Sequence, residues 1–215
     1  MTEGWKAISV AELDAIPVDE GLVWHPIRRR LGIRAFGINA YTSDSLGGQV
    51  VEEHDETGSG AGGHEELYIV MRGRATFTLD GETLDAPAGT LVFINEPGVK
   101  RVAIAEEDDT LVLAVGGEPG RPYAVSAWEF IFAVRPLMEQ AHYADAIELL
   151  EEGLRELPEN PALLYNLARA ESRGGRPLDA LVHLQTAVRA KPEYRMRART
   201  DPAFDPVRRE QGFPG

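Results

Sequence analysis

Hydrophobic and polar residues follow two different patterns along this chain. Up to about residue 120, short apolar runs are separated by glycine, proline and aspartate turn signals, roughly every 8 to 12 residues. From about residue 127, apolar residues instead recur at the spacing of one helix face. The change of pattern at the glycine-rich stretch 116–120 predicts two domains, covering residues 1–120 and 121–215.

The first part predicts a series of short β-strands. Asp80-Gly81 is a two-residue hairpin signal, because both central positions of a type I′ turn need a positive φ. The expected strands cover residues 32–41, 49–54, 66–71, 74–79, 82–85, 90–94, 99–105 and 110–115. Strands of this length and spacing predict a double-sheet jelly roll or a small barrel, so the fold class is mainly β with an added helical part.

The second part predicts paired helices with a repeat of 34 residues. Helices are expected over residues 128–140, 143–154, 162–172 and 177–192. Three pairs of positions show the 34-residue period: Ala146 and Ala180, Gly153 and Ala187, and Pro158 and Pro192. Small residues in the second helix and a proline at its end are typical of tetratricopeptide-like repeats, here over about 127–192.

Two repeats are too few for an independent solenoid, which normally needs at least three. The helices are therefore expected either to pack on the barrel or to pair with another subunit, and a homodimer is expected. The tail from Arg195 to Gly215 is expected to supply a partial cap in which Phe204 and Phe213 dock. A groove that binds a protein partner is the functional interpretation of the repeats, and a structural or dimerising role is the alternative.

Composition and charge exclude several classes of function. The chain has 22 basic and 35 acidic residues, a net charge of −13, which repels a nucleic-acid backbone. Residues 1–120 hold nine of the basic and 21 of the acidic residues, so the first part has a net charge of −12 and residues 121–215 have a net charge of −1. The absence of cysteine excludes disulfides and thiolate zinc sites, and it fits a cytoplasmic protein. No apolar run reaches 18 residues, so no membrane helix is expected.

Two segments of the first part resemble the motifs of the cupin family. In residues 64–73, Glu66 is followed by six residues and Gly73, which is the spacing of the first cupin motif. Gly81, five further residues and Pro87-Ala88-Gly89 resemble the start of the second motif, and residues 93–102 resemble its end. The resemblance covers roughly residues 20–118 and implies a cupin-like double-stranded β-helix, or jelly roll.

The resemblance also implies a metal site that this sequence does not supply. Metal-binding cupins use three histidines and one glutamate, and two of these histidines would fall on Gly60 and Gly62 here. The position of the third histidine is best matched by Lys100, and only Glu66 remains. Glycine has no donor atom, and an ammonium group repels a cation, so no cofactor is expected at the usual site.

A displaced site remains an alternative. His64 lies two residues before Glu66, so both side chains point to the same face of a strand. His54 ends the preceding strand, and His54, His64 and Glu66 would form a set of two histidines and one carboxylate for a divalent metal. The alternatives are a surface His54 with a locally hydrogen-bonded His64, or a metal-free role in ligand binding or acid/base chemistry.

Lys100 and Glu66 are expected to form an ion pair inside the barrel, in place of the metal. In a second interpretation, Lys100, Arg101, Glu66, His64 and Tyr68 line a pocket for a small polar or anionic molecule. A shift of the strand register by one residue would instead point Lys100 outward beside Arg101.

Three hypotheses for function follow from these observations. The first is a non-catalytic module that binds a small ligand or is structural, with helices for association. The second is an enzyme that uses either the displaced metal site or metal-free acid/base chemistry from His64, Glu66 and Tyr68. The third is a scaffold for a protein partner that binds to the repeats. The fold does not choose among them, because one fold supports many functions.

Overall fold

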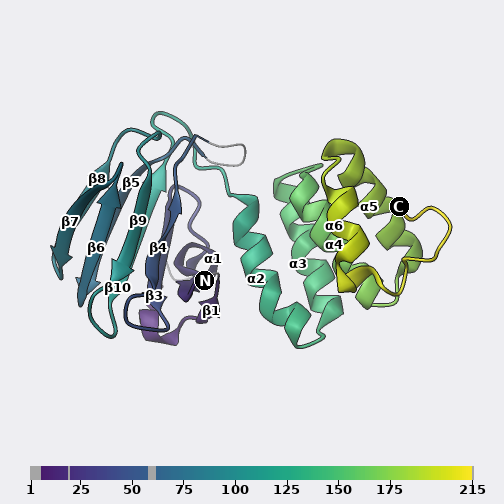
Figure 1. Ribbon diagram of the computed structural model, residues 1–215, viewed down its shortest axis with the longest axis horizontal. Coiled ribbons are helices and arrows are strands. Elements are labelled where there is room, and N and C mark those ends of the chain that lie inside the picture. The colour runs from purple at the N-terminus through teal and green to yellow at the C-terminus, as the bar shows by residue number, and fades with distance from the viewer. Residues whose placement is uncertain (1–5, 19, 58–61, 215) are drawn as a thin grey trace. The chain divides into compact units, whose positions relative to one another are not determined.

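The computed structural model describes residues 6–18, 20–57 and 62–214, and the chain forms two compact units (Figure 1). The first, Met1–Ala124, is called the β unit, and the second, Val125–Gly215, is called the helical unit. The division falls slightly after the glycine-rich stretch 116–120, where the sequence pattern changes.

The β unit consists of two antiparallel sheets, as the strand pattern predicts. One sheet has the order β1 (Ile16–Pro17), β2 (Leu22–His25), β3 (Gly37–Ser43), β10 (Leu111–Gly117), β5 (Glu65–Arg72) and β8 (Leu91–Ile94). The other has the order β4 (Gln49–His54), β9 (Arg101–Ala105), β6 (Arg74–Leu79) and β7 (Glu82–Pro87). Strands far apart in the sequence, such as β3 and β10, are neighbours, which is typical of a jelly roll.

Alternate residues of both sheets form the core of the β unit. Tyr68 and Val70 on β5 and Ala75 and Phe77 on β6 are among the buried residues of this core, and the residues between them are more exposed. This alternation follows from the two-residue period of a strand. It makes β5 the strand that carries side chains from the cupin-like motif into the interior.

The N-terminal segment contains more structure than the sequence predicts. The 3₁₀ helix η1 (Val10–Glu12), β1, β2 and the helix α1 (Ile27–Leu31) all precede β3. The strand expected over residues 32–41 begins only at Gly37, because α1 ends at Leu31, Gly32 follows it with a φ of 73°, and residues 33–36 connect the helix to β3. Leu13 and Ile27 of this segment form a small apolar cluster with Ala40 of β3.

The helical unit confirms the predicted helical hairpins. It contains α2 (Ala127–Glu139), α3 (Tyr143–Glu156), α4 (Pro161–Arg173), α5 (Pro177–Ala190), α6 (Tyr194–Thr200) and the 3₁₀ helix η2 (Pro202–Phe204). Asn160 is the N-cap of α4, because its side-chain oxygen accepts hydrogen bonds from the backbone N–H groups of Ala162 and Leu163. No helix among the described residues is long and apolar enough to cross a membrane.

Small residues at the repeated positions let the helices approach each other closely. Ala146, Ala180 and Ala187 are completely buried. A Cβ atom on Gly153 in α3 would lie 2.9 Å from the ring of Phe130 and 3.1 Å from the side chain of Leu163. The 34-residue period of small residues therefore reflects contacts between neighbouring helices.

The C-terminal tail covers the end of the helical unit, as predicted. Phe204 is completely buried, and its ring centroid lies 5.4 Å from that of Tyr165 on α4 and 6.2 Å from that of Phe213. The hydroxyl of Ser172 donates a hydrogen bond of 2.7 Å to the carbonyl oxygen of Ala203. The predicted docking of Phe204 and Phe213 is thus confirmed.

A buried carboxylate and a histidine join α4 to α5. Nδ1 of His183 lies 2.8 Å from Oε2 of Glu171, whose side chain has no exposed area. The hydrogen bond to Glu171 raises the pKa of His183 above its ordinary value, although partial burial acts in the opposite direction. A histidine whose pKa is higher in the folded state stabilises that state at low pH and loses this effect as the pH rises through the folded pKa.

We therefore expect the helical unit to unfold at lower temperature at about pH 8 than at about pH 6. Melting followed by hydrogen exchange in α4 and α5 measures this difference separately from the β unit. The variant His183→Gln keeps a donor for Glu171 but has no titrating group at this position. Its melting temperature is therefore expected to change less between these two pH values than that of the parent protein. An equal pH dependence in both proteins would contradict the assignment to His183.

Candidate ligand site in the β unit

Glu66 is the centre of a cluster of polar side chains at one end of the core of the β unit. It precedes Tyr68 on the inward face of β5, and the Glu66 side chain is only 12% exposed. The hydroxyl of Tyr68, which is itself buried, donates a hydrogen bond of 2.6 Å to Oε2 of Glu66. Two positions of the cupin-like motif thus meet, as their spacing along the strand predicts.

Arg101 on β9 forms the ion pair that the sequence analysis assigns to Lys100. Nε of Arg101 lies 3.4 Å from Oε2 of Glu66, and the Arg101 side chain is completely buried. Nζ of Lys100 instead lies 2.6 Å from Oε1 of the exposed Glu53, and the Lys100 side chain is 59% exposed. The predicted pair of Lys100 with Glu66 is therefore wrong, and the alternative register, with Lys100 pointing outward, is the one the strand adopts.

The Arg101 guanidinium has few partners for a buried cation. Nη1 donates a long hydrogen bond of 3.5 Å to the carbonyl oxygen of Pro97. Among the described residues, no acceptor completes a hydrogen bond with Nε or Nη2 of Arg101. A buried donor without an acceptor destabilises a fold by about 1–3 kcal/mol, and more for a charged group. These donors are therefore available to a ligand that reaches the cluster.

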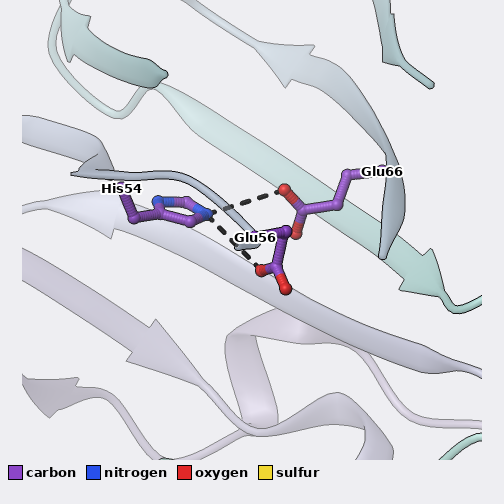
Figure 2. A group of neighbouring side chains, drawn as sticks. All are labelled: His54, Glu56 and Glu66. Carbon is purple, nitrogen blue, oxygen red and sulfur yellow. Dashed lines mark ion pairs between the residues drawn. The ribbon is translucent and has the colours of Figure 1, made fainter. Parts of the chain in front are cut away.

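His54 and Glu56 complete the cluster from the end of β4. Figure 2 shows the His54 ring directed at both carboxylates, with Nε2 3.6 Å from Oε2 of Glu66 and 3.9 Å from Oε1 of Glu56. Nδ1 of His54 lies 2.8 Å from the carbonyl oxygen of Glu52 and donates a hydrogen bond to it. The interpretation of His54 as a pure surface residue is wrong, because its side chain is only 25% exposed and faces Glu66.

Glu56 is the functional candidate that sequence reasoning missed. Its position in the acidic run 52–56 suggests a solvated side chain, yet that side chain is only 12% exposed. Its Oε2 accepts a hydrogen bond of 2.8 Å from the backbone N–H of Gly62 and lies 3.8 Å from Nδ1 of His64. The spacing of two residues from His54 is the signal that could have revealed it.

His64 lies beside the cluster rather than at its centre. Its ring contacts that of Tyr123 at a centroid distance of 5.8 Å, and its polar neighbour is Glu56. Of the predicted site residues, the structure therefore brings together His54, Glu66 and Tyr68, places His64 at the side and Lys100 outside, and adds Arg101 and Glu56.

The environment of the cluster favours charged forms of His54 and Glu66. Burial lowers the pKa of His54, but the carboxylate of Glu66 and the carbonyl of Glu52 outweigh it, so the pKa is raised overall. Burial raises the pKa of Glu66, but His54, Tyr68 and Arg101 together hold it below its ordinary value. Burial and the charge of Glu66 raise the pKa of Tyr68 well above its ordinary value, so its hydroxyl remains a donor.

The donor set does not fit the metal centre that the cupin resemblance implies. His54, Glu56 and Glu66 each offer one atom, and these atoms lie within 4.8 Å of one another. However, Oε2 of Glu66 already faces Tyr68 and His54, and the buried Arg101 cation lies 3.4 Å from it. A divalent ion there would be repelled by that cation and would compete with the Tyr68 hydrogen bond. The set predicted from His54, His64 and Glu66 is not formed either, because His64 contacts Glu56 instead.

No curated protein matches this chain, but several solved structures are similar to it. A cupin protein from Bacteroides fragilis is 20% identical over 55% of this chain and 88% of its own, with a TM-score of 0.37. An RmlC-like cupin from Shewanella frigidimarina is 16% identical over 55% and 95%, with a TM-score of 0.41. A sugar phosphate isomerase of the cupin superfamily from Silicibacter pomeroyi is 13% identical over 53% and 76%, with a TM-score of 0.44.

The helical unit has a match of its own among protein families. The family model described as Tetratricopeptide repeat matches residues 137–199, from the end of α2 through α6. The chain combines a two-sheet β unit, similar to cupin structures, with a helical unit of the tetratricopeptide-repeat type.

Proposed function

We propose that the β unit binds a small polar molecule that carries hydroxyl groups, without a metal ion. The observation that supports this proposal is the buried Arg101 guanidinium, whose Nε and Nη2 lack hydrogen-bond acceptors among the described residues. These donors lie next to the carboxylate of Glu66, and the carboxylate of Glu56 belongs to the same cluster, so the cluster also offers groups that accept hydrogen bonds. A hydroxyl group both donates and accepts, so a sugar, a polyol or a hydroxy acid matches this mixture.

The charge balance of the cluster also favours such a molecule. The carboxylate of Glu66 faces Arg101, and the carboxylates of Glu56 and Glu66 both face His54, whose pKa is raised. A strongly anionic ligand would be repelled by both carboxylates, and a cation would be repelled by Arg101. A neutral or weakly charged polar ligand therefore binds with the smallest electrostatic penalty. The same groups include an acid and a base, so turnover of the bound molecule would identify the protein as a metal-free enzyme instead.

A thermal-shift screen with sugars, polyols and small hydroxy acids tests this proposal. A ligand at a hundredfold its dissociation constant stabilises the folded state by about 2.7 kcal/mol, which raises the melting temperature by several degrees. We expect the variant Glu56→Gln to lose most of this shift, because it removes a charged acceptor and changes the size of the side chain little.

The control variant is Glu53→Gln, which lies on the same strand end but pairs with the exposed Lys100 instead of the cluster. It is expected to keep the full shift. No stabilisation by any of these molecules, or an equal shift in Glu56→Gln, would show that the cluster is not a ligand site. Stoichiometric metal in the purified protein, lost on His54→Gln, would contradict the metal-free part of the proposal.

A cavity in the helical unit supports a second function, the binding of a protein partner. The cavity has a volume of about 560 Å³ and is lined by residues of α2, α4, α6 and the turn after α6. Tyr165 and Tyr194 stack there with ring centroids 4.6 Å apart, and Asp201 accepts a hydrogen bond from Tyr165 and pairs with Arg169. Aromatic faces beside charged groups are typical of surfaces that bind peptides.

Titration of the full chain with a library of fluorescent peptides tests this second function. The variant Arg197→Glu changes a residue that lines the cavity, and Arg195→Glu changes a residue of the same helix outside the cavity lining. We expect about a tenfold or greater loss of affinity for Arg197→Glu alone. Equal binding by both variants would place the peptide elsewhere.

A further inference from the structure

Small residues form a row on the inner face of the six-stranded sheet beside Glu66. The register places Gly116 of β10 opposite Glu66 of β5 on one side and opposite Gly37 of β3 on the other. Residues that lie opposite each other in neighbouring strands point to the same face of a sheet. Ala114, two residues before Gly116, shares this face and packs against the core of the β unit. We call Gly37, Ala114 and Gly116 the small-residue floor.

A side chain at either glycine would fill the space above this floor. A Cβ atom on Gly116 would lie 3.2 Å from Cγ of Glu66 and 3.7 Å from its Oε1. A Cβ atom on Gly37 would lie 2.8 Å from the ring of Tyr123 and 3.1 Å from its hydroxyl oxygen. Glu66 therefore borders the floor on one side and Tyr123 on the other, and the glycines between them let a small molecule approach the backbone closely.

Asn39 on β3 is a buried polar residue beside this floor. It lies opposite Ala114, so its side chain points to the same inner face, and it is only 6% exposed. Among the described residues, no donor forms a hydrogen bond with Oδ1 of Asn39. A buried polar atom without a partner destabilises the free protein and marks a place where a further molecule can complete the hydrogen bond. Asn39 therefore indicates a ligand independently of Arg101.

The ring of Tyr123 is held at the border of the floor by two neighbours. The centroid of the His64 ring lies 5.8 Å from that of Tyr123. The guanidinium carbon of Arg28 lies 5.6 Å from the Tyr123 centroid, and Nη1 of Arg28 donates a hydrogen bond of 3.3 Å to the carbonyl oxygen of Ile33. A tyrosine ring fixed in this way offers a rigid apolar surface with a polar hydroxyl group at one end.

We propose that the ligand of the β unit is a neutral cyclic polyol, whose ring lies on the small-residue floor between Glu66 and Asn39. This inference rests on the proposed function, because it names the kind of hydroxylated molecule that the Glu66 cluster binds. Neighbouring strands lie about 4.8 Å apart, so β5 and β3, which are separated by β10, lie about 10 Å apart. Two hydrogen bonds of about 2.8 Å leave roughly 4–5 Å between two hydroxyl oxygens of the ligand. A pyranose or cyclitol ring spans this separation between hydroxyl groups on carbons that are not adjacent.

The rigidity of the site favours a ring over an open chain. Glu66 and Asn39 lie on strands of one sheet, so the separation of their strands is fixed. An acyclic polyol loses rotation about its carbon–carbon bonds when it binds, whereas a ring holds its hydroxyl groups in position beforehand. The C–H groups on the face of such a ring are apolar and match the ring of Tyr123.

Calorimetric titration of the full chain with matched cyclic and acyclic polyols tests the inference. Myo-inositol and methyl glucopyranosides represent the rings, and sorbitol, which has as many hydroxyl groups as myo-inositol, represents the open chain. We expect at least one ring to bind about tenfold more tightly than sorbitol, since the ring loses less conformational freedom. Sorbitol binding as tightly as the rings, or binding of small hydroxy acids alone, would overturn this inference and leave the proposed function intact. Binding of none of these molecules would overturn both.

Gly116→Ala and Gly117→Ala form a matched pair of variants for the floor. The methyl group of Gly116→Ala occupies the floor beside Glu66, so this variant is expected to lose most of the affinity for the ring. A Cβ atom on Gly117 meets no atom within 4 Å, so Gly117→Ala is expected to keep the affinity of the parent. Equal affinities in the two variants would show that the ligand does not lie on the floor.

Asn39→Leu tests the far side of the site and distinguishes a binding role from a structural one. Because Oδ1 of Asn39 has no donor among the described residues, an apolar side chain of similar size should leave the melting temperature of the free protein unchanged or raise it. The affinity for the ring is expected to fall by on the order of tenfold, because one hydrogen bond is lost. A folded Asn39→Leu variant that binds the ring as tightly as the parent would overturn the role of Asn39.

Discussion

Replacement of Arg101 by leucine is expected to lower the free energy of unfolding of the β unit by about 3 kcal/mol. The Arg101 side chain is completely buried and lies 3.4 Å from Glu66, which is itself only 12% exposed. Removal of the cation leaves a buried carboxylate that keeps Tyr68 and His54 as its partners among the described residues. Urea unfolding of the variant, followed by hydrogen exchange in β5 and β9, measures the loss in the β unit alone.

Lys100→Leu is the matched control for this experiment. Lys100 is adjacent in sequence but pairs with Glu53 at the surface, where ion pairs contribute about 0–1 kcal/mol. The two variants therefore differ by about 2 kcal/mol or more if β9 has the register described above. A larger loss for Lys100→Leu than for Arg101→Leu would show that Lys100, and not Arg101, is the partner of Glu66.

The double variant Arg101→Leu/Glu66→Leu separates the cost of an unpaired charge from a loss of packing. Replacement of both buried charges by apolar side chains is often neutral or stabilising. We expect the double variant to recover most of the stability that Arg101→Leu loses. If the double variant instead loses as much free energy of unfolding as the two single variants together, each side chain stabilises the fold by its own packing and not through the ion pair.

The register of β9 shows what the sequence pattern could and could not predict. Val102 and Ile104 are larger and more apolar than Ala103 and Ala105, so the pattern favours an inward face that includes Lys100. In the structure the alanines point inward, since Ala103 lies opposite the large, buried Phe77 of β6. The space available for a side chain depends on the neighbouring strand, which the sequence of β9 alone does not contain.

Other parts of the fold could be predicted because their signals are local. The Asp80-Gly81 turn, with φ values of 48° and 89°, joins β6 to β7 where the sequence places a hairpin. The helical hairpins follow from the 34-residue period, which needs no knowledge of long-range contacts. By contrast, β1 and β2 are only two and four residues long, and too few residues alternate there to give a pattern.

The candidate site shows the same limit. Glu66 and Tyr68 are found from one strand because a spacing of two residues puts both on one face. Arg101 and Glu56 come from other elements and join the cluster through the pairing of β9 with β4 and the turn after β4. The place of Arg101 depends on a contact between distant parts of the chain, so no local pattern indicates it, whereas Glu56 has only its two-residue spacing from His54 as a local signal.

Replacement of Phe204 by alanine is expected to destabilise the helical unit by about 3–5 kcal/mol. Phe204 is completely buried and packs against Tyr165 on α4, and it belongs to the same apolar cluster as Leu184 on α5 and Tyr194 on α6. An array of two repeats has little stability beyond its contacts with neighbouring elements, so the loss of this cap affects the whole array. Urea unfolding followed by hydrogen exchange in α4 and α5 measures the effect.

Phe213→Ala is the matched control, because it removes the other aromatic side chain of the tail that packs on the helical unit. Phe213 packs at the edge of the same cluster and is only partly buried, so its loss should cost roughly half as much or less. The β unit should keep its hydrogen-exchange protection in both variants, because each unit has its own core. Equal protection of α4 and α5 in Phe204→Ala and in the parent would show that the repeats are stable without the tail. The 34-residue period would then specify a self-sufficient pair of hairpins, and the residues after α5 would have a role other than closing it.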